Sequence, residues 1–135
     1  MAVFSATDFT VSVNAVDLTD HCSSVETSFD VADLETTAFA DTWTTRIGGL
    51  KSGTVSLNFH QDFAASSVDA TLWAALGTVI EIILVPTSAA VSATNPSYTF
   101  NVLVTSISPV SASVGDLAVM SVSWPISGAV ARATS

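Results

Sequence analysis

Apolar and polar residues alternate with a period of two in four separate stretches of this 135-residue chain, which constrains its fold more than any other feature. A strand with one buried face and one wet face shows this pattern. Residues 9–19 also predict a hairpin that turns near Asn14 and Ala15. Residues 78–85 predict a strand covered on both faces, because Glu81 alone interrupts the apolar character expected there. The apolar members of the four stretches are Val25, Phe29 and Val31; Val55, Leu57 and Phe59; Tyr98, Phe100, Val102 and Val104; and Ala118, Met120, Val122 and Trp124.

One segment has helical spacing instead. In "SSVDATLWAALG", Ser66 is a candidate N-cap, Asp69 lies three residues later as its capping-box partner, and Gly77 is a candidate terminator. Leu72 and Leu76 fall on one stripe of this helix, so we expect both side chains in the core.

These elements predict a single mostly-β domain over residues 1–135, a β-sandwich or small barrel of six to eight strands with one short flanking α-helix. Residues 32–53 show no clean alternation and are too long for an ordinary hairpin loop, so we expect a long functional loop there. Residues 86–97 form a second, polar loop, and residues 125–135 are expected to be an extended C-terminal tail.

The composition suggests assembly with other chains. Apolar residues make up 49% of the chain and charged residues 11%, against about 25% in ordinary globular proteins, so one core would hide too little of the apolar surface. Three basic residues and a net charge of −9 argue against tight binding to nucleic acid. The longest apolar run, residues 72–85, is too short and too interrupted to span a membrane, so no membrane insertion is expected. The lack of a signal-peptide pattern and the single Cys22 favour synthesis in the cytoplasm.

Few residues are candidates for catalysis or metal binding. The segment "DLTDHC" contains metal-ligand types without the paired spacing of a zinc site, and a polar turn is the simpler interpretation. An acid/base couple in "FHQDF" is weighed against a solvated histidine on the wet face of a strand. We therefore expect no enzyme activity, no catalytic residues, no metal and no cofactor. The residues concerned are Asp17, Asp20, His21 and Cys22 in the first segment, and His60 and Asp62 in the second.

Four stretches together carry a family resemblance, from about Val13 to Ala133. They are "VDLTDHCSSVETSFDVADLETTAFADTWTTRIGGLKSGTVSLNFHQDF", "SSVDATLWAALG", "LVPTSAAVSATNPSYTF" and "SVGDLAVMSVSWPISG". In combination they resemble the small tail tube (major tail) proteins of long-tailed, siphovirus-type bacteriophages, especially those that infect actinobacteria. The resemblance implies a β-sandwich with a flanking helix, six copies per ring, and rings stacked into a tube through which DNA leaves the capsid. It also implies assembly in the host cytoplasm, a place in the virion tail, and tape measure, terminator and distal tail proteins as partners.

Combined with the wet strand faces, this resemblance implies site residues of two kinds. Polar side chains would line an electronegative channel that lets DNA pass without tight binding. The long loop would reach the next ring, with two apolar anchors and with its basic residues facing acidic residues of a neighbour. A mobile surface loop, a capsid decoration protein of similar fold and a small cytoplasmic ligand-binding β domain are the alternatives. The channel residues are Glu26, Ser28, Asp30, Ser56 and Asn58, and the loop residues are Phe39, Trp43, Arg46 and Lys51.

Overall fold

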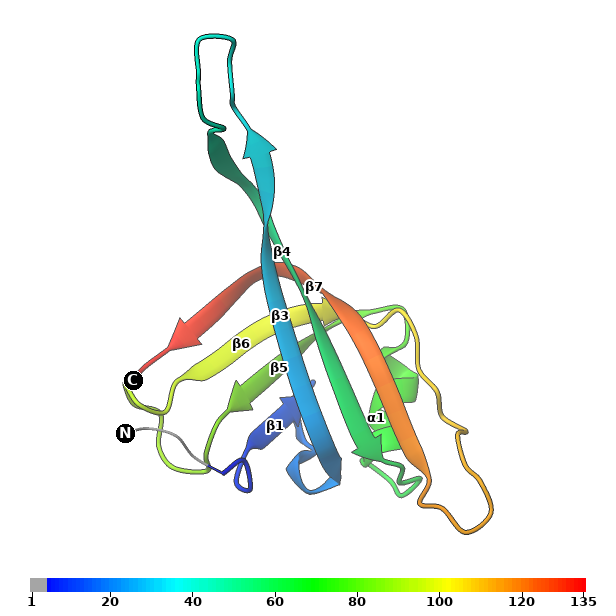
Figure 1. Ribbon diagram of the computed structural model, residues 1–135. Coiled ribbons are helices and arrows are strands. Elements are labelled where there is room, and N and C mark those ends of the chain that lie inside the picture. The colour runs from blue at the N-terminus through cyan, green and yellow to red at the C-terminus, as the bar shows by residue number, and fades with distance from the viewer. Residues whose placement is uncertain (1–4) are drawn as a thin grey trace.

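Seven antiparallel strands and one α-helix make up the computed structural model, which describes residues 5–135 (Figure 1). The strands form one sheet in the order β2-β1-β5-β6-β7-β4-β3. The predicted mostly-β fold with one short helix is confirmed. The elements are β1 (Thr10–Val13), β2 (Val16–Asp17), the 3-10 helix η1 (Thr19–His21), β3 (Cys22–Glu35), β4 (Arg46–His60), α1 (Val68–Ala75), β5 (Val79–Val85), β6 (Ser97–Leu103) and β7 (Val119–Ala133).

Strand β7 connects the two halves of this sheet, one formed by β3 and β4 and the other by β2, β1, β5 and β6. Its first half pairs with β4, from His60 opposite Val119 to Thr54 opposite Pro125, and its second half pairs with β6 as far as Ala133. Residues 125–135 are therefore strand over most of their length, and the expected tail was wrong. The sequence pattern breaks there because Pro125 lacks a donor N–H and Gly128 has a φ of 92°, a region that favours glycine.

The core lies between the two halves of the bent sheet, because buried side chains from both halves belong to one cluster. The predicted inward faces of β4, β6 and the first half of β7 are buried, except that Tyr98 and Ala118 are half-buried. On β3 the prediction was wrong for Phe29 and Val31, which are exposed because that part of the strand leaves the core. Strand β5 differs from its prediction: Ile80, Ile82 and Leu84 are buried, but Val79 and Glu81 on the other face are exposed. Its apolar run is therefore covered on one face, not two.

Helix α1 begins one residue later than expected. Ser67 is its N-cap without a side-chain cap hydrogen bond, and Ser66 has a φ of 59°, so the predicted capping box does not form. Gly77, with a φ of 83°, follows the C-cap residue Leu76 as a terminator should. Leu72 is fully buried, whereas Leu76 is 43% exposed, in contrast to the burial expected for both leucines.

The end of β3 and the start of β4 extend away from the body of the molecule as a two-stranded ribbon, because β4 pairs with β7 only from Thr54 onward. This ribbon, here called the arm, comprises residues 30–52 (Figure 1). The expected loop at 32–53 is thus mostly paired strand, and only residues 36–45 connect β3 to β4. Alternation was absent from the sequence because both faces of the arm are exposed. A register shift between Val31 and Asp33 breaks the pattern further.

Candidate functional site

The outward face of β3, β4 and the first half of β7 is exposed and almost entirely polar. All five residues predicted for a channel lie on it, because Glu26 is opposite Ser56 and each of the others occupies a position of the same parity on its strand. We call this surface the polar face. It consists of Ser24, Glu26, Ser28, Asp30, Ser52, Thr54, Ser56, Asn58, Ser121 and Ser123.

Side chains of the polar face hydrogen-bond one another across the strands. Asn58 Nδ2 donates to Ser24 Oγ at 2.7 Å, and Ser121 Oγ donates to Asn58 Oδ1 at 2.5 Å. Ser56 Oγ donates to Ser123 Oγ at 3.2 Å. These groups satisfy part of one another's hydrogen-bonding capacity, and the charged members of the face are both carboxylates. The face therefore offers a phosphate few free donors and a negative potential.

Strand β3 is an edge of the sheet, so the polar face ends at backbone groups that have no partner strand. A long edge strand is a template for pairing with another chain. Arm and polar face share this strand, which means that a neighbour paired along β3 would extend the polar face onto the next chain.

The connection at the end of the arm exposes two large apolar side chains, Phe39 and Trp43, and Trp43 is 83% exposed. The strands of the arm add Leu34, Ile47 and Leu50, which are also exposed. Sequence reasoning found the first two and missed the other three, although apolar residues in a stretch without alternation were the available signal. An arm of this kind presents far more apolar surface than a solvated hairpin requires.

The structure separates the two basic residues that lie close together in sequence. Arg46 Nη1 donates to Asp33 Oδ2 at 2.7 Å within the arm, and both side chains are more than half exposed. Lys51 lies at the base of the arm instead, where it lines a groove with Arg132. Arg46 thus has an acidic partner within its own chain, and the two cations do not form one cluster.

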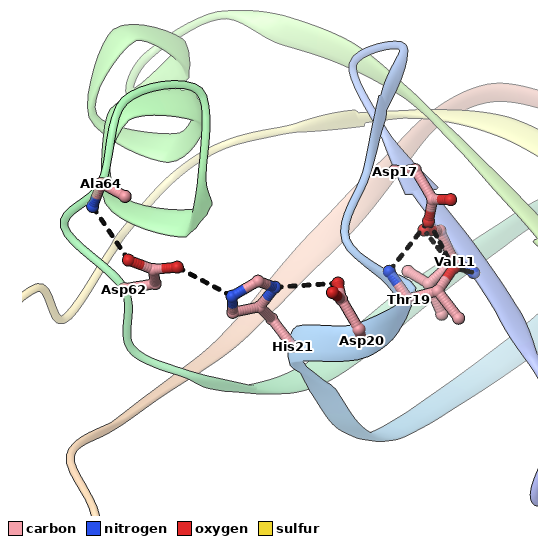
Figure 2. A network of polar contacts seen from close by, with 7 residues as sticks. All are labelled: Val11, Asp17, Thr19, Asp20, His21, Asp62 and Ala64. Carbon is pink, nitrogen blue, oxygen red and sulfur yellow. Dashed lines mark hydrogen bonds and ion pairs between the residues drawn. The ribbon is translucent and has the colours of Figure 1, made fainter.

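A polar network holds η1 against the segment before α1 (Figure 2). His21 Nε2 lies 2.8 Å from Asp62 Oδ2, and His21 Nδ1 lies 3.0 Å from Asp20 Oδ1. Asp62 Oδ1 also accepts the Ala64 N–H at 2.9 Å. Partial burial lowers the pKa of His21, but the bonds to Asp62 and Asp20 outweigh it and raise the pKa above its usual range. The Ala64 N–H is the largest cause of a lowered pKa at Asp62, and the hydrogen bond to His21 lowers this pKa further.

The contacts of this network bear on both chemical hypotheses from the sequence, the metal site and the acid/base couple. Asp62 pairs with His21 rather than with His60, so the His60–Asp62 couple is not formed. Asp17 binds Thr19 and Cys22 Sγ donates to the Ser24 carbonyl, so neither joins His21. Within residues 5–135, no group of three or more His, Cys, Asp or Glu side chains is arranged to hold a metal ion. The network is an internal brace.

The solved structures that share this fold include two from gene transfer agent particles. A chain in the virion of a native gene transfer agent (GTA) particle aligns with 96% of this chain and 98% of its own length, with a TM-score of 0.77 and 16% identity. A chain in the tail of an empty GTA particle, refined with C6 symmetry, aligns over the same shares with a TM-score of 0.69 and 18% identity. No family model and no curated protein matches the sequence. At these identities the likeness is one of fold. In the part of the chain that is described, no helix has the length and apolar character needed to cross a bilayer.

Proposed function

We propose that this chain is a non-enzymatic structural subunit of a phage-like tail, in which six copies form a ring and the rings stack into a tube. The polar face of each copy lines the central channel, and DNA passes through the channel without tight binding. The arm of each copy reaches the neighbouring ring. Virion tail is the location that follows, with other tail proteins as partners at the two ends of the tube.

The observation that carries this proposal is the polar face, which lies beside an open sheet edge. Ring closure along β3 would join the polar faces of successive subunits into one continuous wall. Such a wall would carry Glu26 and Asp30 from every copy, and its negative charge would repel DNA phosphates instead of holding them.

The shared fold supports the proposal from a second direction. One of the similar chains belongs to a tail with C6 symmetry, and the alignment covers nearly the whole of both chains. A contact that repeats around a six-fold axis is heterologous, joining two different patches of the same chain. The exposed apolar arm and the rest of the body supply such unlike patches.

Negative-stain electron microscopy of the concentrated, purified protein tests the proposal. The expected result is hollow tubes, with end-on views that show six-fold rings around a central channel. A discrete monomer at every concentration would overturn it, and so would solid or flat assemblies.

Fractionation of particles separates the tail proposal from capsid decoration. The tail proposal expects this chain in purified tails and not in tailless capsids. Its recovery from tailless capsids alone would identify a decoration protein.

A further inference from the structure

A groove of about 640 Å³ lies at the base of the arm, between β4 and the second half of β7. Its apolar lining, here called the floor, comes from Phe29, Ile126 and Val130, and Tyr98 lines the groove as well. Gly53 lets these elements meet, since a Cβ there would lie 2.8 Å from the Ser28 carbonyl oxygen and 3.0 Å from Ile126. The groove is therefore a consequence of close backbone packing where the arm leaves the body.

Two of the three basic residues in the whole chain, Lys51 and Arg132, line this groove. The Arg132 guanidinium lies 5.9 Å from the centre of the Tyr98 ring, and its Nε donates to Tyr98 Oη at 3.2 Å. This stacking orients the guanidinium and leaves its terminal N–H groups available. Within residues 5–135, neither cation forms an ion pair with a carboxylate. In a chain with twelve carboxylates, the groove is thus a positive, partly apolar exception.

The loop between β6 and β7, residues 104–118, has the complementary character. Its base is fixed, because Trp124 Nε1 donates to the Ser106 carbonyl at 2.8 Å and Gln61 Nε2 donates to the Pro109 carbonyl at 2.7 Å. Its far part presents Val114 and Leu117, which are 106% and 65% exposed, on either side of the Gly115–Asp116 turn. The loop therefore combines a protruding carboxylate with apolar neighbours, as the groove combines cations with an apolar floor.

Groove and loop lie toward opposite ends of the molecule. The groove is at the base of the arm, and Figure 1 shows the loop between β6 and β7 at the end away from the arm. A head-to-tail neighbour would bring its loop toward this groove. Asp41, in the connection at the end of the arm, is a less suitable occupant, because its carboxylate already accepts the Ala38 N–H at 2.8 Å. Among the described residues, the carboxylate of Asp116 forms no ion pair.

We infer that the groove receives the Val114–Leu117 turn of a second copy of this chain, with the Asp116 carboxylate between Lys51 and Arg132 and with the two apolar side chains on the floor. This inference rests on the proposed head-to-tail stacking of rings. It assigns the stacking contact a second component besides the arm, and it explains why two of the few basic residues are placed where their own chain offers no carboxylate.

Disulfide cross-linking tests the contact directly. In a Cys22→Ser background, Ala129→Cys marks the groove and Val114→Cys marks the loop; both positions are exposed. Mild oxidation of the double-cysteine protein is expected to produce a ladder of covalent oligomers on a non-reducing gel. Each single-cysteine protein is the control and should give at most dimers.

Charge reversal tests the chemistry of the contact. Asp116→Lys is expected to raise the concentration needed for assembly about tenfold, since it places like charges together. Combining it with Lys51→Glu and Arg132→Glu should restore assembly. Glu81→Lys changes the net charge equally on the exposed face of β5 and is the matched control, expected to assemble within about twofold of the unmodified chain.

The outcomes separate this inference from the proposed function. Six-fold tubes without a cross-linked ladder would overturn the groove contact and leave the proposed function standing. A ladder without six-fold tubes would support the contact and overturn the proposed function. Neither tubes nor a ladder would overturn both. Failure of the triple charge variant to assemble, with its melting temperature unchanged, would also count against the contact.

Discussion

Leu72 and Leu76 lie one helical turn apart but differ sharply in burial, at 0% and 43% exposed. Leu72→Ala should lower the free energy of unfolding by about 2 to 5 kcal/mol, because it removes a large side chain from a packed core. Leu76→Ala should cost less than about 1 kcal/mol, because water already reaches that side chain. Urea unfolding of the unassembled subunit measures both. Equal losses would show that the two leucines are buried alike.

At the same scale, the His21–Asp62 pair makes stability depend on pH. Because the pKa of His21 is raised in the folded state, protonated His21 stabilises the fold. This contribution is fully present below pH 6.5, the ordinary pKa, and is lost as pH rises through the folded pKa. Because the pKa of Asp62 is lowered in the folded state, its ionised carboxylate also stabilises the fold. This contribution is present above pH 3.8 and is lost as pH falls through the folded pKa. The pair therefore stabilises most between those two values.

Melting curves of the unmodified protein and of His21→Gln, recorded from pH 5 to pH 9, test this dependence. Above pH 6.5, the melting temperature of the unmodified protein should fall more with rising pH than that of the variant. Parallel curves would mean that the charge on His21 contributes nothing.

At the scale of elements, the arm is expected to stabilise the assembly and not the subunit. Trp43→Ala should leave the unfolding free energy within about 0.5 kcal/mol, because the side chain is 83% exposed, and should weaken tube formation strongly. Sedimentation and melting of the same sample provide the two measurements. Thr44→Ala, an exposed neighbour in the same connection, is the control. If Trp43→Ala forms normal tubes, the arm does not form the contact between rings.

The elements also show what the sequence can predict. Strands with one buried face, such as residues 54–60 of β4, follow from alternation because burial selects every second residue. The arm and the second half of β7 could not be predicted from alternation. Both faces are exposed to solvent in the arm and the backbone is irregular in β7, so burial does not select every second residue there. For the site, alternation places Glu26 and Ser56 on one face. The groove joins Lys51 to Arg132 from a distant strand, and only the sheet order brings those two together.

At the scale of the whole molecule, the charge of the polar face is expected to govern DNA passage. Glu26→Lys combined with Asp30→Lys should still assemble, because both positions are exposed, but the wall should then retain DNA through its phosphates. Co-sedimentation of short duplex DNA with tubes at low and high salt tests this prediction. Retention should appear in the variant only and should disappear at high salt. Equal retention by both proteins would place these residues away from the channel.

Strand β7 has a consequence for the timing of folding during translation. It is the last of the seven strands to leave the ribosome, and it provides the junction between the β3–β4 half and the β1–β5–β6 half. Until it is made, the apolar faces of the two halves have no common strand to hold them together, and the core cannot close. A nascent chain therefore lacks both the finished groove and the fixed base of the arm. Contacts with another chain that use the groove or the base of the arm can therefore form only after β7 has been made.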